Sequence, residues 1–133
     1  MPPARSKLHR SRINGVLIDC KSDDIGAAAQ FWAQALGRAI DRDHAGSRGN
    51  FMMLETPTGE IAVQVQLVDH ESRVHLDIET DDIEAEVARM ELLGATVDRR
   101  LERWVVMLAP TGQRFCIVRI QREGFPETAS TWE

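Results

Sequence analysis

One histidine and two aspartates are the residues of this chain best suited to acid–base chemistry. His75 and Asp77 stand two residues apart in the strand-like residues 73–79, so their side chains are expected on one face. Asp19 holds the place equivalent to that of Asp77 in another strand-like stretch, residues 13–20. A histidine beside carboxylates can act as a general acid or base, or can help to bind a metal. His75 could equally be a hydrogen-bonded core histidine, and the aspartates could cap or bridge strand ends.

These residues sit in a pattern that the chain contains twice. Residues 53–59, MLETPTG, return as residues 107–112, MLAPTG. Upstream, LID at 17–19 leads to DI at 24–25 and LG at 36–37, and LDI at 76–78 leads likewise to DI at 82–83 and LG at 93–94. Such a repeat indicates two copies of one supersecondary unit. Two copies commonly pack about a pseudo-two-fold axis, and the cleft where they meet is a default place for function.

The first copy is predicted to be β-α-β-β-β. Residues 13–20 are apolar and β-branched, as in a buried strand. Residues 22–24 can cap a helix over 25–36, and Gly37 can end it. A weak strand is predicted near 39–42, followed by a hairpin of residues 51–55 and 61–67.

The second copy repeats this order, with strands at 73–79, 95–99, 104–108 and 114–120. Asp81 and Glu84 fit a capping box at the start of its helix, and Gly94 can end it. The helical spacing predicts two faces. The buried stripe is Ile83, Val87, Met90 and Leu93, and the face toward water is Glu84, Glu86, Arg89 and Glu91.

Composition and charge narrow the class of protein. The 133 residues, 28% of them charged, suit one soluble domain, and the net charge of −5 disfavours a nucleic-acid partner. Residues 1–12 form a basic N-terminal arm and residues 121–133 a C-terminal tail, in which Trp132 is expected to pack on a neighbouring surface. No segment resembles a signal peptide or a membrane span, and two distant cysteines suit a cytoplasmic protein with reduced thiols.

With these motifs the chain resembles the vicinal oxygen chelate superfamily, which holds glyoxalase, bleomycin-resistance and extradiol-dioxygenase proteins. The resemblance is greatest to its small glyoxalase-like branch. It implies an α+β fold, with modules at about 13–68 and 73–120 forming a curled mixed sheet around a central cleft. The motifs that carry it, within residues 13–120, are IDC at 18–20, FW at 31–32, LG at 36–37, VQ at 63–64, RVHLD at 73–77, DI at 82–83, LGA at 93–95, PTG at 110–112 and FC at 115–116.

The resemblance also implies a ligand set, in which four side chains from the first and last strands of both copies line the cleft. His75 matches one ligand position, and its counterpart in the first copy is Leu17, which cannot bind a metal. The last position falls on Cys116 in the second copy, and on Val63 in the first, or on Gln64 if the strand is shifted by one residue. The implied set of His75, Cys116 and Gln64 is incomplete, so the cofactor is either a Zn, Ni, Fe or Mn ion or none.

Two functions follow from the resemblance. The first is an enzyme, lyase-, isomerase- or dioxygenase-like, that uses metal-assisted proton transfer or rearrangement next to a carbonyl. Its catalytic residues would be His75, Asp19 and Asp77, and its ligand-binding residues would be Gln64, Trp32, Trp104 and Cys116. The alternative is a metal-free, drug-sequestering protein that binds a small molecule without turnover. A homodimer is expected on family grounds, and membrane partners are not.

Overall fold

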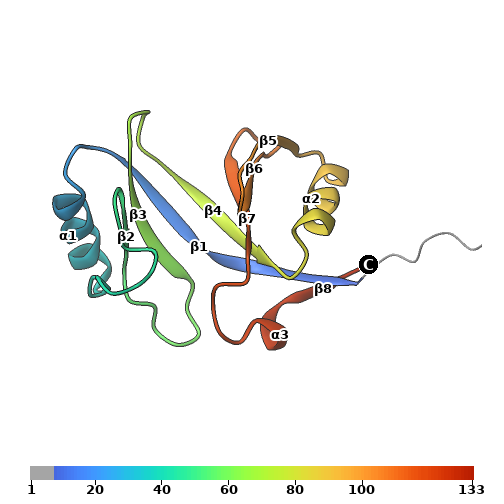
Figure 1. The fold of residues 1–133 in the computed structure, drawn as a ribbon, viewed down its shortest axis with the longest axis horizontal. Helices are drawn as coiled ribbons and strands as arrows, with labels where there is room; N and C mark the ends of the chain where they lie inside the picture. The colour runs from blue at the N-terminus through green and yellow to red at the C-terminus, as the bar shows by residue number, and fades with distance from the viewer. Residues whose placement is uncertain (1–7) are drawn as a thin grey trace, which may run out of the picture. The chain divides into compact units, whose positions relative to one another are not determined.

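The computed structural model describes residues 8–133, and its elements follow the predicted order (Figure 1). Arg5 and Lys7 of the predicted arm lie outside the described residues. Within residues 8–133, no helix is long and apolar enough to cross a membrane. The elements are β1 (His9–Lys21), α1 (Ile25–Leu36), β2 (Phe51–Met53), β3 (Ala62–Val68), β4 (Arg73–Thr80), α2 (Ile83–Leu92), β5 (Thr96–Arg100), β6 (Trp104–Leu108), β7 (Arg114–Arg119), α3 (Phe125–Thr128) and β8 (Ser130–Trp132).

The chain divides into two compact units. One is continuous, from Gly15 to Leu76, and is called the central unit because it takes the middle of the sequence. The other, called the outer unit, joins the chain up to Asn14 to Asp77–Glu133. Strands β1 and β4 each run unbroken through the boundary, so each unit contains part of both.

The central unit is a four-stranded sheet in the order β2-β3-β1-β4. β1 and β3 are parallel, and β2 is antiparallel to β3. The two parallel strands approach so closely at Gly15 that a Cβ there would lie 2.3 Å from the Ala62 carbonyl oxygen. Helix α1 covers one face, where the core cluster consists of Ile18, Ala33, Leu54 and Val63.

Helix α1 begins and ends as predicted. The Asp24 side chain accepts a hydrogen bond from the Ala27 N–H at 3.0 Å, which caps the helix. Gly37 ends it in the left-handed conformation, with φ of 68°, which glycine adopts without steric cost. The predicted strand at 39–42 is reduced to a single bridge between Ile40 and Leu54.

The outer unit places β4-β7-β6-β5 in order, with antiparallel pairing of β6 to both neighbours. Helix α2 covers one face of these strands. The core cluster consists of Val87, Met90, Ala95, Val105, Met107 and Ile117. Strands β5, β6 and β7 begin and end within one residue of their predicted bounds.

Three predictions about α2 are wrong. Asp81, predicted to form a capping box with Glu84, accepts instead from the backbone N–H of Arg10, and its neighbour Asp82 caps the helix by accepting from the Ala85 N–H. Glu86, predicted to face water, is fully buried, and Leu93, predicted to be buried, is 64% exposed. Leu93 is the C-cap, one residue beyond the end of the helix at Leu92.

The C-terminal residues form ordered elements where the sequence predicted a tail. The short helix α3 leads into β8, which pairs antiparallel with the start of β1, from His9↔Trp132 to Ser11↔Ser130 (Figure 1). Residues 9–12, predicted to belong to the basic arm, are therefore part of β1. Trp132 packs on a neighbouring surface as predicted, because its ring lies 3.8 Å from the Arg89 guanidinium.

Candidate functional site

In the central unit, the polar side chains lie on the face of the sheet away from α1. Ile18 and Val63 pack in the cluster beneath α1, so their strand neighbours point the other way. The pairing of β1 with β3 sets Leu17 beside Gln64 and Asp19 beside Gln66. This face therefore carries one acidic group, Asp19, in its middle strand.

Asp19 and His75 form the central contact of this face. His75 Nδ1 lies 2.9 Å from Asp19 Oδ2, and the Arg73 Nε lies 3.8 Å from the same oxygen. The Asp19 side chain is 2% exposed, whereas the side chains of His75 and Arg73 are 13% and 43% exposed. Asp19 thus holds one imidazole nitrogen, and Nε2 is the nitrogen that can accept a proton or bind a metal.

The second oxygen of Asp19 is a buried polar atom without a hydrogen bond. Among residues 8–133, Oδ1 has no partner. An unsatisfied buried acceptor costs about 1–3 kcal/mol, which is tolerated more often at functional sites than elsewhere. The orphaned oxygen therefore supports a functional reading of Asp19 over a purely structural one.

Gln64 takes the place in the first copy that Cys116 takes in the second. Leu54 and Val63 fill the core beneath α1, whereas Met107 and Ile117 fill it beneath α2. The hairpin of the first copy is thus shifted by one residue, and Gln64 lies on the face away from the helix. Its amide donates to the Gly46 carbonyl at 2.8 Å, and a Cβ at Gly46 would lie 2.8 Å from that nitrogen, so a larger residue there would displace the Gln64 amide.

The face away from α2 in the outer unit holds Cys116 and Trp104. Ile117 and Met107 pack beneath the helix, so Cys116 points the other way. Trp104 pairs with Val118 and lies on the same face as Cys116. The Cys116 side chain is buried, and Trp104 is 38% exposed.

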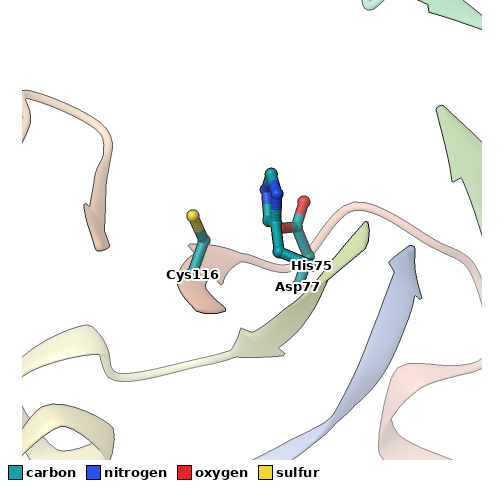
Figure 2. A group of neighbouring side chains, drawn as sticks. All are labelled: His75, Asp77 and Cys116. Atoms are coloured by element: carbon teal, nitrogen blue, oxygen red, sulfur yellow. The ribbon is translucent and has the colours of Figure 1, made fainter. Parts of the chain in front are cut away.

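Three candidate ligands converge around β4. His75 and Asp77 stand two residues apart on that one unbroken strand, and one ligand atom from each of His75, Asp77 and Cys116 lies within 4.8 Å of the others. Figure 2 shows the three side chains directed to the same side. Asp77, predicted to be a catalytic residue, thus joins the predicted ligands His75 and Cys116 in this group.

The donor atoms of this group fit a divalent metal. A nitrogen, a carboxylate oxygen and a sulfur at this spacing suit an ion of borderline softness, of which zinc is the commonest in proteins. The Asp19–His75 contact is the outer-shell partner that a metal-binding histidine typically has. His75, Asp77 and Cys116 therefore form a possible metal site.

One predicted ligand-binding residue, Trp32, belongs to the core of the central unit. Trp32 packs against the core cluster beneath α1, on the opposite face from Asp19, with its ring 5.0 Å from that of Phe31. Trp32 therefore does not line this face.

Burial raises the pKa of the neighbouring Cys20 thiol despite a hydrogen bond with Trp32, and the charge of Asp19 raises it further. A thiol in that state is a poor nucleophile.

Two carboxylates of the outer unit, those of Glu79 and Glu86, are fully buried, which the sequence analysis did not predict. Glu86 lies 2.7 Å from His9 Nε2 and accepts two hydrogen bonds of 2.9 Å from Arg89. Glu79 accepts from Arg12 at 2.6 Å. Burial alone would raise the pKa of Glu86, but hydrogen bonds from Arg89, Ser11 and His9 and the charge of Arg89 lower it overall. These groups tie β1, α2 and the C-terminal segment together.

Known proteins match this chain in family and in fold. Residues 15–118 match the family model described as a glyoxalase-like domain. A superfamily member from Vibrio splendidus, titled glyoxalase/bleomycin resistance protein/dioxygenase, has a TM-score of 0.53 at 17% identity, over 83% of this chain and 99% of that one. A methylmalonyl-CoA epimerase from Mycobacterium tuberculosis has 0.56 at 15% identity, over 84% and 89%. A hypothetical protein from Bacillus halodurans has 0.57 at 14% identity, over 86% and 97%. A search of curated proteins found no match.

Proposed function

The chain belongs to the glyoxalase-like domain family, and we propose that it is an enzyme that moves a proton at a carbon next to a carbonyl group. The observation that carries this proposal is the contact between Asp19 and His75, on the face of the sheet away from α1. A carbon next to a carbonyl is acidic enough for a positioned imidazole to take its proton, and the carbonyl oxygen then receives the negative charge.

Asp19 is the positioning residue of this pair. It accepts a hydrogen bond from Nδ1–H, which fixes the tautomer in which Nε2 carries a lone pair. Nε2 can use that lone pair to accept the substrate proton or to bind a metal, and both uses need Nδ1 to be held. Loss of the Asp19 carboxylate is therefore expected to impair the site without removing His75.

His75 would act either as the base or as a metal ligand, because its Nε2 has one lone pair. In the second case His75, Asp77 and Cys116 would hold a divalent metal, which would polarise the carbonyl group. Metal content distinguishes the two cases without knowledge of the substrate. If His75 is a ligand, purified protein is expected to bind one zinc, nickel, iron or manganese ion per chain, and His75→Ala to lose it.

Solvent exchange tests the proton transfer. The protein is incubated in deuterium oxide with small ketones, 2-oxo acids and thiohemiacetals of 2-oxoaldehydes, and proton NMR records the loss of the C–H signal next to the carbonyl. We expect exchange with the wild type, none with His75→Gln, and at least tenfold slower exchange with Asp19→Asn. His70→Gln is the matched control, because His70 contacts only the Glu71 carbonyl among the hydrogen bonds of the described residues.

Two outcomes would contradict the proposal. Exchange that survives in His75→Gln would remove His75 from the reaction. Saturable binding of these compounds by the wild type without exchange would instead support a small-molecule-binding protein without turnover.

A further inference from the structure

Arg73 presents an open guanidinium beside the Asp19–His75 pair. It precedes His75 by two residues on β4 and so lies on the same face. Its Nε approaches Asp19 Oδ2 at 3.8 Å, which is too long for a hydrogen bond. Among residues 8–133, its guanidinium makes no hydrogen bond, and the side chain is 43% exposed and so accessible to a ligand.

Two other cations of the central unit are engaged with partners. Lys21 pairs with Glu71 at 3.0 Å. Arg38 donates to the Ile61 carbonyl and to Glu60. Arg73, by contrast, lies beside Asp19 with its hydrogen-bonding edge open to a ligand.

A guanidinium recognises a carboxylate through two parallel N–H donors. With Nε turned toward Asp19, the two terminal nitrogens of Arg73 can form that pair. Gln66 lies beside Asp19 on the same face, and its amide can donate a further hydrogen bond.

We infer that the substrate is a short carboxylic acid, whose carboxylate is bound by Arg73 while its acidic C–H faces His75. This inference rests on the proposed function for the identity of the reacting carbon. Two residues along a strand span about 7 Å, so the carboxylate and the reacting carbon are expected to be a few bonds apart. Arg73 is then the residue that selects an anionic substrate over a neutral one.

Matched probes test the selection. Levulinate carries a carboxylate two bonds from a carbon next to its ketone, and methyl levulinate is its neutral analogue. NMR titration at low salt is expected to show wild-type binding of levulinate at least tenfold tighter than of the ester. Arg73→Gln is expected to lose that preference by weakening levulinate tenfold or more, with the ester unchanged. Arg73→Lys should recover only part of it, because lysine lacks the paired donors.

The control variant is Arg48→Gln, an exposed arginine of the same unit, which should bind both probes as the wild type does. Equal binding of the two probes by the wild type, or an unchanged preference in Arg73→Gln, would overturn the inference. So would the absence of binding by levulinate, pyruvate and 2-oxoglutarate at tens of millimolar.

The same samples separate this inference from the proposed function. Levulinate that binds through Arg73 without deuterium exchange would leave an anion-binding site and remove the proton transfer. Exchange that depends on His75 but not on Arg73 would leave the proton transfer and remove the anion selection.

Discussion

Glu86 shows how a single buried charge can organise its surroundings. Its side chain is fully buried, and its two carboxylate oxygens form hydrogen bonds with Arg89, His9 and Ser11. The Ser11 hydroxyl in turn accepts a hydrogen bond from the Trp132 indole N–H. A buried carboxylate is tolerated only when it is bonded in this way. Removing its charge would leave the Arg89 guanidinium and the His9 ring without their acceptor.

Glu86→Gln is therefore expected to lower the free energy of unfolding by about 2–3 kcal/mol. Urea unfolding followed by circular dichroism measures this. The matched control is Glu84→Gln in the same helix, because Glu84 and Arg100 form an exposed pair worth less than about 1 kcal/mol. Equal effects of the two substitutions would show that Glu86 does not act as a buried ion.

The same residue predicts a dependence on pH. The pKa of Glu86 is lowered on folding from its ordinary 4.5, so its contribution to stability is complete above pH 4.5. It is lost as the pH falls from 4.5 through the lower folded value. The stability gap between the wild type and Glu86→Gln should therefore narrow below pH 4.5, and a gap that stays constant down to pH 3 would contradict this.

At the residue scale, the sequence predicted which residues hold acid–base chemistry but not their partners. Asp19 and Asp77 stood out because they hold equivalent places in the two copies, and strand alternation placed His75 on the same face as Asp77. The contact between His75 and Asp19, however, depends on the pairing of distant strands. Arg73 stood out only as part of the RVHLD motif, since nothing in its neighbours marks an open guanidinium. Glu86 was misjudged because helical periodicity assigns carboxylates to water and cannot register a histidine 77 positions away in β1.

At the scale of elements, local signals decided where helices begin and end. Asp24 and Asp82 hold the same place in the two copies, and each caps its helix by accepting from the backbone N–H three residues later. Strand register was harder, since a shift of one residue exchanges the two faces of a strand. The sequence left Val63 and Gln64 as alternatives, and the packing of Leu54 and Val63 beneath α1 decided for Gln64.

The caps supply a prediction about α1. Asp24→Ala should destabilise the protein by about 0.5–2 kcal/mol, because the Ala27 N–H loses its acceptor, and Asp24→Asn should recover most of the loss. Chemical denaturation gives both values. Asp23→Ala is the control, since Asp23 is exposed and precedes the cap, and a loss as large as that of Asp24→Ala would contradict the assignment.

For the whole molecule, the division into two units is the main feature, and the C-terminal segment completes one of them. Arg12 donates to Thr128 and to the carbonyls of Arg122 and Glu123, and its guanidinium lies 5.3 Å from the centre of the Phe125 ring. Sequence patterns do not predict these contacts, because α3 and β8 are too short to produce a periodic pattern. Their order comes from contacts with β1 and α2.

Trp132→Ala tests how this segment is held. The substitution removes the hydrogen bond from the indole to Ser11 and the contact with Arg89, so it should lower the free energy of local unfolding of this segment by about 2 kcal/mol. The rate of amide hydrogen exchange there should rise roughly 30-fold. Hydrogen exchange should quicken at residues 9–11 and 125–132 and stay unchanged in α1 and β3. Trp104→Ala is the control, and a uniform change over the whole chain would contradict a local clasp.

The pairing of β1 with β8 also sets an order for the folding of a newly made chain. A ribosome releases the central unit, residues 15–76, as one continuous stretch that already contains its own core. His9–Ser11, although made first, must wait for residues 130–132, a delay of roughly 3–11 s after residue 76 at 5–20 residues per second. During that interval the edge of His9–Ser11 that later meets β8 is unpaired, so these residues stay open to chaperones and to misassociation until the last strand arrives.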